Sequence, residues 1–188
     1  MARPSVADER REQIIAATLQ TMAQHGISGT TLDRIADTAG MSRGHVRHFV
    51  GNRDRLLLDT ARAFYAAPAV LPAEIDDLPA ALDYLFGDEF ASSSADNAIV
   101  LAFVELARSS PDIASVLAEA YGSARERLIE FIAAAHPGAG SLLHEVAAQG
   151  VLTTALGNVF IGDFDREPQR TERSRAAVDA LLGALERH

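Results

Sequence analysis

The chain has 188 residues, of which 48% are hydrophobic and 23% charged, a balance typical of folded proteins and unlike that of disordered ones. It contains no cysteine, which excludes disulfides, thiolate metal sites and cysteine nucleophiles. No apolar run reaches the roughly 18 residues of a transmembrane helix, and the charged N-terminal sequence has no apolar signal-peptide core. We therefore expect a cytoplasmic protein without a membrane partner.

The net charge of −9 is distributed unevenly along the chain. Residues 1–65 carry nine arginines and seven acidic residues, a balance of +2, whereas residues 66–188 carry eight arginines and 19 acidic residues, a balance of −11. All 17 basic residues are arginine, whose planar guanidinium suits phosphate and guanine. The acidity therefore belongs to the C-terminal two-thirds, and the N-terminal third stays compatible with nucleic acid.

The hydrophobic periodicity of the N-terminal third is helical. It predicts helices over residues 7–25, 31–38, 43–49 and 53–65. Gly26 is placed to end the first helix, whose apolar face we expect at Ile15, Thr18, Leu19 and Met22. For the second helix, Thr30 followed three residues later by Asp33 forms a near capping box.

Residues 66–78 contain two prolines and three acidic residues, and we interpret them as the junction between two domains, residues 1–66 and residues 67–188. Beyond this junction the sequence predicts helices over residues 79–92, 96–108, 112–135, 141–162 and 172–187. No alternating stretch is long enough to predict a strand. The predicted fold class is therefore all-α.

Residues 26–56 have the spacing of a helix-turn-helix motif. The small Ala36 lets a second helix cross closely, Gly40 suits a tight turn, and Val46 supplies an apolar anchor in the second helix. A plain helical hairpin is the alternative. The occurrence of all three features at the required offsets favours the helix-turn-helix, with an N-terminal three-helix domain for DNA binding.

The second helix of this motif concentrates polar residues without an acid among them, namely Arg43, Gly44, His45, Arg47 and His48. On an arbitrary helix such a set would form a solvated face. On the second helix of this motif it favours contact with base edges in the major groove of DNA. Gly44 costs about 1 kcal/mol of helix propensity, which a close approach to DNA would offset.

Residues 8–60 resemble the DNA-binding region of the tetracycline-repressor (TetR) family of bacterial regulators. The matching residues are Ile14–Ile15, Gly26, Thr30–Thr31, Ile35–Ala36, Ala39–Gly40, Ser42–Arg43–Gly44 and Asn52–Arg53. The chain departs from the family at Arg47–His48–Phe49–Val50, where Tyr-Tyr-His-Phe is common, so it has no phosphate-contacting tyrosine there.

The resemblance implies roles for individual residues. The groove-facing residues would be Arg43, Gly44, His45 and His48. The phosphate-binding residues would be Thr31, Arg47 and Arg53, with Ser42 acting first as a helix cap and then as a phosphate contact. Arg43 is the candidate for a bidentate guanine contact. Arg3, Arg10 and Arg11 would form either a backbone-contacting arm or a solvated tail, and Phe49 would belong to the core.

In the TetR family the C-terminal region forms a ligand cavity and a dimer. The last two predicted helices carry stripes of small and apolar residues that we expect at a homodimer interface: Gly150, Thr154, Gly157, Val178, Leu181, Leu182 and Leu185. Two glycines inside one helix indicate close helix packing. The neighbouring helix could belong to the same chain, but we favour the partner subunit.

Candidate ligand-binding residues in this region are Tyr84, Phe86, Phe90, Phe103, Glu105, Tyr121, His144 and Asn158. Each one singly also fits an ordinary core or surface position. Together they are typical of a mostly apolar pocket with a few polar groups, as small-molecule sites have. We expect a small, mostly apolar effector molecule and no cofactor.

No catalytic motif supports an enzyme. His144–Glu145 begins like a zinc-protease helix, but position 148 is alanine instead of the second histidine. Glu105, His136 and His144 have scattered spacing, so we expect no metal site. The sequence predicts a ligand-responsive regulator, most simply a repressor, whose homodimer binds a pseudo-palindromic double-stranded DNA operator. The alternative is a dimeric small-molecule-binding helical protein that does not read DNA.

Overall fold

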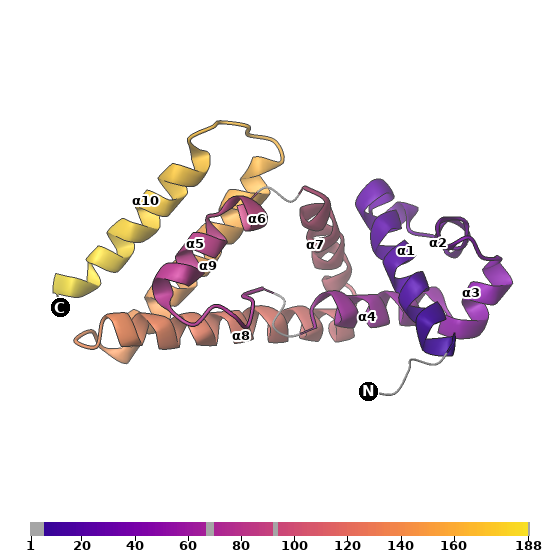
Figure 1. Cartoon of the computed structure of the whole chain (residues 1–188), viewed down its shortest axis with the longest axis horizontal. Coiled ribbons are helices and arrows are strands. Elements are labelled where there is room, and N and C mark those ends of the chain that lie inside the picture. Colours follow the sequence, from indigo (N-terminus) through magenta and orange to yellow (C-terminus); the bar gives the residue numbers. More distant parts are fainter. Residues whose placement is uncertain (1–5, 67–69, 92–93, 188) are drawn as a thin grey trace. The chain divides into compact units, whose positions relative to one another are not determined.

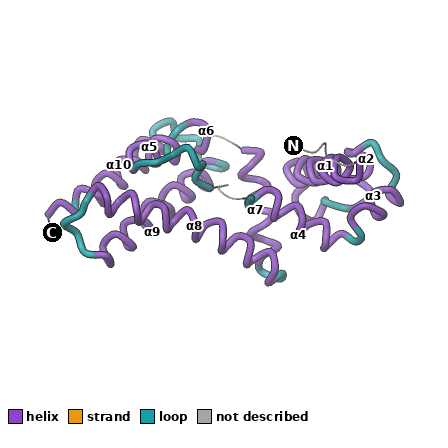
Figure 2. The backbone as a smooth tube through the Cα atoms, turned by 60° about the horizontal axis from the view of Figure 1, so that its bottom comes forward, coloured by secondary structure: helices purple, strands orange, loops and turns teal. Residues whose placement is uncertain are grey.

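The computed structural model describes residues 6–66, 70–91 and 94–187 of the chain (Figure 1). These residues form α-helices and one short 3-10 helix, and no strand occurs among them, as Figure 2 shows. The predicted all-α fold class is confirmed. No helix in the described ranges combines the length and the apolarity needed to cross a membrane.

The backbone divides into two compact units. The first unit combines the chain up to Ala66 with Ala95–Ala118, and the second combines Ala67–Ser94 with Glu119–His188. Residues 95–118, which follow the predicted domain junction in the sequence, thus belong to the first unit. The functional division into residues 1–66 and 67–188 stays a prediction.

The helices of the first unit are α1 (Val6–Gly29), α2 (Leu32–Ala39), α3 (Arg43–Val50), α4 (Arg53–Phe64) and nearly all of α7 (Ser94–Ala107). The second unit contains α5 (Leu78–Leu85), α6 (Asp88–Ala91), α9 (Ser141–Gly162), α10 (Arg170–Gly183) and η1 (Leu185–Arg187). Helix α8 (Pro111–Ala135) begins in the first unit and ends in the second. The single helix predicted over residues 79–92 is therefore two helices, because the chain turns at Gly87, whose N–H donates to the Tyr84 carbonyl at 3.1 Å.

Local signals decide where the N-terminal helices begin and end. Gly26 breaks α1, as predicted, because its φ of 63° and ψ of −177° are not helical. The cap of α2 is Thr31 and not Thr30, since the Thr31 side chain accepts the Arg34 N–H at 3.3 Å. Thr30 is instead fully buried and donates to the Gly26 carbonyl at 2.7 Å.

The first unit has its own apolar core, formed by Ile14, Ala17, Ile35, Ala36, Ala39, Val46, Val50 and Leu56. Helix α1 faces this core with Ile14 and Ala17. Of its predicted apolar face, Thr18 and Met22 are buried as expected, whereas Ile15 and Leu19 are only partly buried. Farther along the first unit, Phe103 of α7 is fully buried, and its ring lies 5.9 Å from Phe64 and 5.8 Å from Tyr65.

The second unit is built around the antiparallel helices α9 and α10, which pack side by side (Figure 1). Its core includes Leu128 and Ile132 of α8, Val151 of α9 and Val178 of α10. Arg127 donates to the backbone carbonyls of Leu71, Pro72 and Ile75, which ties the segment before α5 to α8.

An ion pair joins α10 to α5. Arg175 Nη1 lies 3.0 Å from Asp83 Oδ1, and Arg175 Nε lies 3.0 Å from Asp179 Oδ1. Burial lowers the pKa of the Arg175 guanidinium, but the hydrogen bonds and charges of the two carboxylates outweigh it and raise the pKa above its ordinary value. The ion pair with Asp83 thus links α10 to α5 at the surface of the second unit.

Candidate nucleic-acid interface

The turn between α2 and α3 has the geometry that a helix-turn-helix requires. Gly40 adopts a left-handed conformation, with φ of 65° and ψ of 34°. Its N–H donates to the Asp37 carbonyl at 3.2 Å, and the Met41 N–H donates to the Ala36 carbonyl at 2.9 Å. Ser42 then caps α3, because its hydroxyl accepts the His45 N–H at 3.2 Å. The predicted turn glycine and helix cap are both confirmed.

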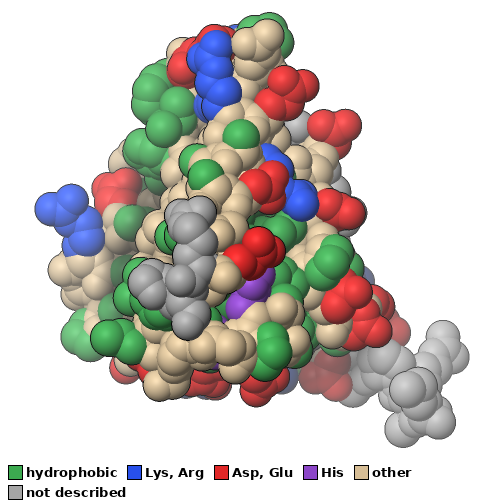
Figure 3. Space-filling model, turned by 90° about the vertical axis from the view of Figure 1, so that its left-hand side faces the viewer, with side chains coloured by type: hydrophobic (Ala, Val, Ile, Leu, Met, Phe, Trp, Pro, Cys, Tyr) green, Lys and Arg blue, Asp and Glu red, His purple; other side chains and the backbone are tan. Residues whose placement is uncertain are grey.

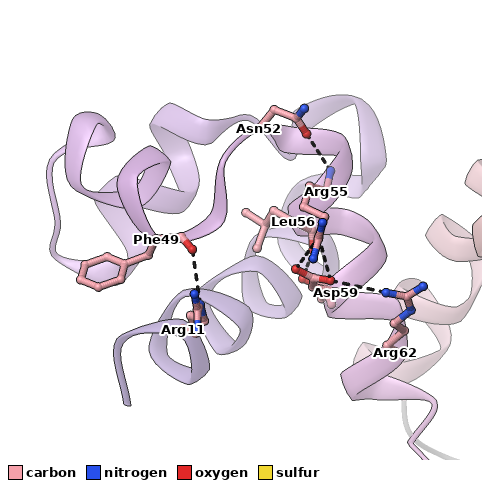
Figure 4. A network of polar contacts seen from close by, with 8 residues as sticks. Arg11, Phe49, Asn52, Arg55, Leu56, Asp59 and Arg62 are labelled. Atoms are coloured by element: carbon pink, nitrogen blue, oxygen red, sulfur yellow. Dashed lines mark hydrogen bonds and ion pairs between the residues drawn. The ribbon is translucent and has the colours of Figure 1, made fainter. Parts of the chain in front are cut away.

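Side chains of α1 hold the ends of α2 and α3 in place. Gln13 donates to the Ala39 carbonyl at 2.8 Å, at the last residue of α2. Arg11 points toward α3 and donates to the Phe49 carbonyl at 3.4 Å (Figure 4). Arg11 also lies 3.7 Å from Asp8. Arg10 bonds Gln13 at 2.7 Å, and Arg3 lies outside the described residues. Arg10 and Arg11 therefore belong to a helix that supports α3.

Helix α3 buries one side and exposes the other. Val46 is fully buried, as predicted, and Val50 lies beside it in the core. The exposed residues are Arg43, Gly44, His45, Arg47 and His48, which are the residues expected to face or touch DNA. None of the residues of α3 is acidic. The helix thus presents only cationic and neutral polar groups on its accessible side.

Two ring contacts order the histidines on this exposed side. Phe49 is half-buried against the core, in keeping with its predicted role. Its ring centroid lies 5.1 Å from that of His45 and 5.3 Å from that of His48. Both histidines therefore pack against the Phe49 ring while they remain exposed, and their contact with DNA stays a prediction.

Gly44 has no packing role in the described part of the chain. An added Cβ at this position would meet no atom within 4 Å. Its backbone conformation is that of an ordinary helix, so neither conformational strain nor close packing requires a glycine here. A glycine that weakens a short helix without an internal reason indicates an external one.

Arg43 is already engaged in an ion pair. Its Nη1 lies 3.1 Å from Asp33 Oδ2 and 3.3 Å from Asp33 Oδ1, and both side chains are more than 60% exposed, at 62% and 63%. The candidate guanine contact therefore shares its guanidinium with a carboxylate of α2. No ion pair of Arg47 occurs among the described residues, which leaves its guanidinium available.

Arg53, a predicted phosphate contact, is used inside the protein. The first residue of α4, it is half-buried and donates from Nε to the Thr30 carbonyl at 2.7 Å and from Nη2 to the Ile27 carbonyl at 2.8 Å. Both carbonyls follow the break in α1, and the Ile27 carbonyl also accepts the Thr30 N–H at 3.2 Å. The structure thus gives Arg53 a structural role, and its contact with phosphate stays a prediction.

The neighbouring arginines of α4 form a surface chain of charges (Figure 4). Asn52 caps the helix by accepting the Arg55 N–H at 2.8 Å. Asp59 lies 3.2 Å from Arg55 and 3.8 Å from Arg62. Because both arginines share one carboxylate, this segment has a surplus of positive charge.

Sequence reasoning missed the residues that act across helices. The sequence predicts a role for Asp33 only in a near capping box, and it predicts no role for Gln13. No periodic spacing relates Asp33 to Arg43 or Gln13 to Ala39, since each pair joins two different helices. Only the folded arrangement of α1, α2 and α3 brings them together.

The predicted dimer residues of α10 pack mostly within their own chain. Val178, Leu182 and Leu185 are buried in its core, and a role for them in a dimer interface stays a prediction. A Cβ at Gly150 would lie 2.5 Å from Leu181 Cδ2, so this glycine allows α10 of the same chain to approach α9. The close packing that the glycines indicated is intramolecular at this position.

A different face of α9 is exposed and apolar. We call it the α9 apolar face, and it consists of Leu142 (69% exposed), Val146 (54%), Phe160 (49%), Ile161 (40%) and, in the following turn, Phe164 (72%). The rings of Phe160 and Phe164 lie 6.1 Å apart. Gly157 faces open space, and Thr154 and Leu181 are half-buried. Exposed Gln149 and Thr153 separate Leu142 and Val146 from Phe160 and Ile161, so the face has an apolar patch toward each end of α9, and exposed apolar patches are typical of interaction surfaces.

The predicted ligand-binding residues have various surroundings. Phe103 and Glu105 belong to the first compact unit, where Phe103 is buried and Glu105 exposed. In the second unit, Tyr84 and Tyr121 are half-buried beside the core. His144 is buried and donates from Nε2 to the His136 carbonyl at 2.9 Å, because a carbonyl can only accept.

Asn158 is committed to helix packing. It is 2% exposed, accepts from Arg170 Nε at 3.0 Å and donates to Thr171 Oγ1 at 3.2 Å. These bonds join α9 to α10. Asn158 thus has an internal role, and a ligand contact by it or by the other candidates stays a prediction. In the described ranges no three histidine or acidic side chains come close enough to hold a metal ion.

Comparison with known proteins places the N-terminal helices in one family. Residues 14–60 match the family model described as bacterial regulatory proteins, tetR family. The chain is 45% identical over 62 residues to the HTH-type transcriptional regulator BetI of Paraburkholderia phymatum, a match that covers 33% of this chain and 32% of BetI. The matched segment thus spans about a third of that relative.

Solved structures share the fold over nearly the whole chain. A TetR transcription regulator from Haloarcula marismortui is similar with a TM-score of 0.76 at 19% identity, over 94% of this chain and 97% of that one. SmeT in its complex with triclosan is similar with a TM-score of 0.69 at 18% identity, over 94% and 91%. At these identities the likeness concerns the fold. Residues 14–60, with their helix-turn-helix geometry, thus match the TetR family of bacterial regulatory proteins, and the chain as a whole shares the fold of the solved structures.

Proposed function

We propose that this protein is a DNA-binding transcriptional regulator, acting as a repressor in the cytoplasm and without catalysis. Its homodimer would bind a pseudo-palindromic operator and release it when a small molecule binds to the region of residues 67–188. The observation that carries the proposal is the exposed side of α3. There, five exposed polar or glycine residues, with no acid among them, lie within six successive positions after the turn of a capped helix-turn-helix.

Two further features support DNA as the partner of α3. Gly44 has no internal packing neighbour, so an approaching DNA backbone or base edge would explain why a side chain is absent. Arg47 is exposed without an ion pair among the described residues, as a phosphate contact requires. The C-terminal region would repel DNA by its charge of −11, and Figure 3 shows one face of the chain on which carboxylates are widespread.

The α9 apolar face supports the dimer. Phe160 and Phe164 both expose their aromatic rings to solvent. Exposed apolar patches of this kind are typical of surfaces that a partner covers. A second copy of the same face would cover it in an isologous contact. Two recognition helices would then meet successive major grooves about 34–36 Å apart.

The effector is proposed from composition and from a similarly folded protein. SmeT has been obtained in complex with triclosan. The second unit of the present chain offers aromatic side chains beside its core, among them Tyr84 and Tyr121. A molecule that binds the DNA-free geometry more tightly would lower the affinity for the operator. By linkage, the operator would lower the affinity for that molecule by the same factor.

A titration of fluorescent duplex DNA tests the DNA-binding part of the proposal. The DNA flanking the protein's own gene and a scrambled duplex of equal composition would be titrated at several salt concentrations. We expect tight, salt-sensitive binding to one palindromic segment. Equal binding to both duplexes at every salt concentration would favour the alternative, a small-molecule-binding protein that does not read DNA.

Two variants separate base reading from phosphate binding. Arg47→Ala should weaken binding to the specific and the scrambled duplex by similar factors, because a phosphate contact carries no sequence information. Arg43→Ala should weaken specific binding selectively, by about tenfold per half-site if the guanine contact is bidentate. Matching effects of the two variants on both duplexes would contradict the assigned roles.

A further inference from the structure

Asp33 forms an exposed ion pair with Arg43, the proposed guanine contact. It lies in the first turn of α2, and its two carboxylate oxygens are 3.1 and 3.3 Å from a single nitrogen, Nη1, of Arg43. Arg43 is the first residue of α3, directly after the Ser42 cap. The pair therefore connects the first turn of one helix to the first turn of the other.

The geometry leaves part of the Arg43 guanidinium free. A guanidinium has five N–H donors, and the ion pair with Asp33 uses only those on Nη1. The Nη2 and Nε donors remain, and two donors are what a bidentate contact with O6 and N7 of guanine needs. A carboxylate that holds Nη1 reduces the number of orientations available to the remaining donors.

The same carboxylate affects binding to any DNA. An exposed negative charge beside a predicted base contact repels phosphates, and it competes with them for Arg43. On random DNA this competition lowers the affinity, because Arg43 then contacts mainly the phosphate backbone. On a site that presents guanine, Arg43 can keep Asp33 and bind the base through its other donors.

We propose that Asp33 is a positioning residue that raises sequence specificity, by orienting Arg43 toward guanine and by weakening its contacts with phosphates. This inference rests on the proposed function. Asp33 acts through Arg43 and needs no contact of its own with DNA. Its contribution to specificity therefore depends on the presence of Arg43.

The test compares affinities for two duplexes. The first is the duplex that the wild-type protein selects from a randomised library, and the second is a scrambled duplex of the same composition. The specificity ratio is the dissociation constant for the scrambled duplex divided by that for the selected one. Asp33→Asn keeps the shape of the side chain and removes its charge. We expect it to tighten binding to the scrambled duplex and to lower the specificity ratio by about fivefold.

Two comparisons isolate the role of Arg43. Asp37→Asn removes an equal charge from the same helix, at an exposed residue without an ion pair among the described residues, and should change the ratio less than twofold. In an Arg43→Ala background, Asp33→Asn should leave the ratio unchanged. The thermal stability of each variant, measured separately, detects any purely structural effect.

Each outcome decides between distinct conclusions. A wild-type protein that selects no duplex would overturn the proposed function and this inference together. A wild-type protein that selects one, with an Asp33→Asn ratio equal to its own, would overturn the inference and leave the proposed function intact. An equal fall in the ratio without Arg43 would also overturn it, because the effect would then be general repulsion.

Discussion

The helix-turn-helix region and the α9–α10 pair differ in how directly their sequences reveal their roles. In the first region, Gly40, Ser42 and Val46 adopt the predicted turn, cap and core positions. In the second, Val178 and Leu182 are buried in the core of their own chain, although the sequence predicts them at a dimer interface. The turn and cap of the first region are set by residues close together in the sequence. The roles of the α9 and α10 residues depend instead on which side of each helix packs against other helices of the same chain.

The contrast shows that an apolar stripe on a helix does not by itself reveal which element packs against it. A stripe at helical spacing predicts that the residues are covered but not by what. In α10 the stripe is covered by α5, α8 and α9 of the same chain, whose residues share its core cluster. In α9, by contrast, the apolar side chains of Leu142, Val146 and Phe160 stay exposed.

The largest expected effect concerns that face. The double substitution Phe160→Glu and Phe164→Glu places four carboxylates in a symmetric dimer contact and removes four apolar rings from it. We expect the dimer dissociation constant to rise by about 1,000-fold or more, equivalent to about 4 kcal/mol. Sedimentation velocity over a range of concentrations would measure the change.

Val104→Glu is the matched control for the dimer. This residue of α7 is 45% exposed, close to the exposure of Phe160, but lies outside the α9 apolar face. The control variant should remain dimeric. A double variant that remains dimeric, or a control that dissociates as readily, would locate the interface elsewhere.

A second pair of substitutions tests whether the two compact units are separately stable. Leu56 in the first unit and Leu128 in the second are both 0% exposed. Replacing either by alanine should lower the free energy of unfolding of its own unit by about 2–5 kcal/mol. Hydrogen exchange should therefore rise in α1 to α4 for Leu56→Ala and in α5, α9 and α10 for Leu128→Ala. An equal rise in both units for both variants would show that they unfold together.

A third substitution distinguishes the structural role of Arg53 from its predicted phosphate contact. Arg53→Ala removes two hydrogen bonds to the Ile27 and Thr30 carbonyls and should destabilise the first unit by about 2 kcal/mol. Arg55→Ala breaks only an exposed ion pair and should cost less than about 1 kcal/mol. Chemical denaturation measures both. Equal costs would show that the Arg53 bonds contribute little to folding.

The smallest expected effect comes from Gly44→Ala, which should raise thermal stability and lower operator affinity. Gly44→Ala should stabilise α3 by about 0.5–1 kcal/mol, because the added methyl meets no neighbour and the unfolded chain loses freedom. It should at the same time weaken operator binding if DNA approaches the helix closely. Thermal denaturation and the DNA titration give the two values. A variant that gains stability and keeps full affinity would exclude a close approach at this residue.

The sequence by itself determined most of the helices, the turn of the helix-turn-helix and the match of residues 14–60 to the TetR family. Helical periodicity, the left-handed Gly40 and the Ser42 cap are properties of near neighbours in the chain, so they could be predicted without the fold. The exposed polar set of α3 followed from the same reasoning, because Val46 had to face the core.

Tertiary structure alone decided the partners of residues that lie on different helices. It brought Asp33 to Arg43, gave Arg53 to the carbonyls after the α1 break, and bound Asn158 to Arg170. It also turned Gly150 toward Leu181 of the same chain and left Phe160 exposed. The physical reason is that helical spacing specifies which residues share a face, while the energy of burial or ion pairing depends on the element packed against that face.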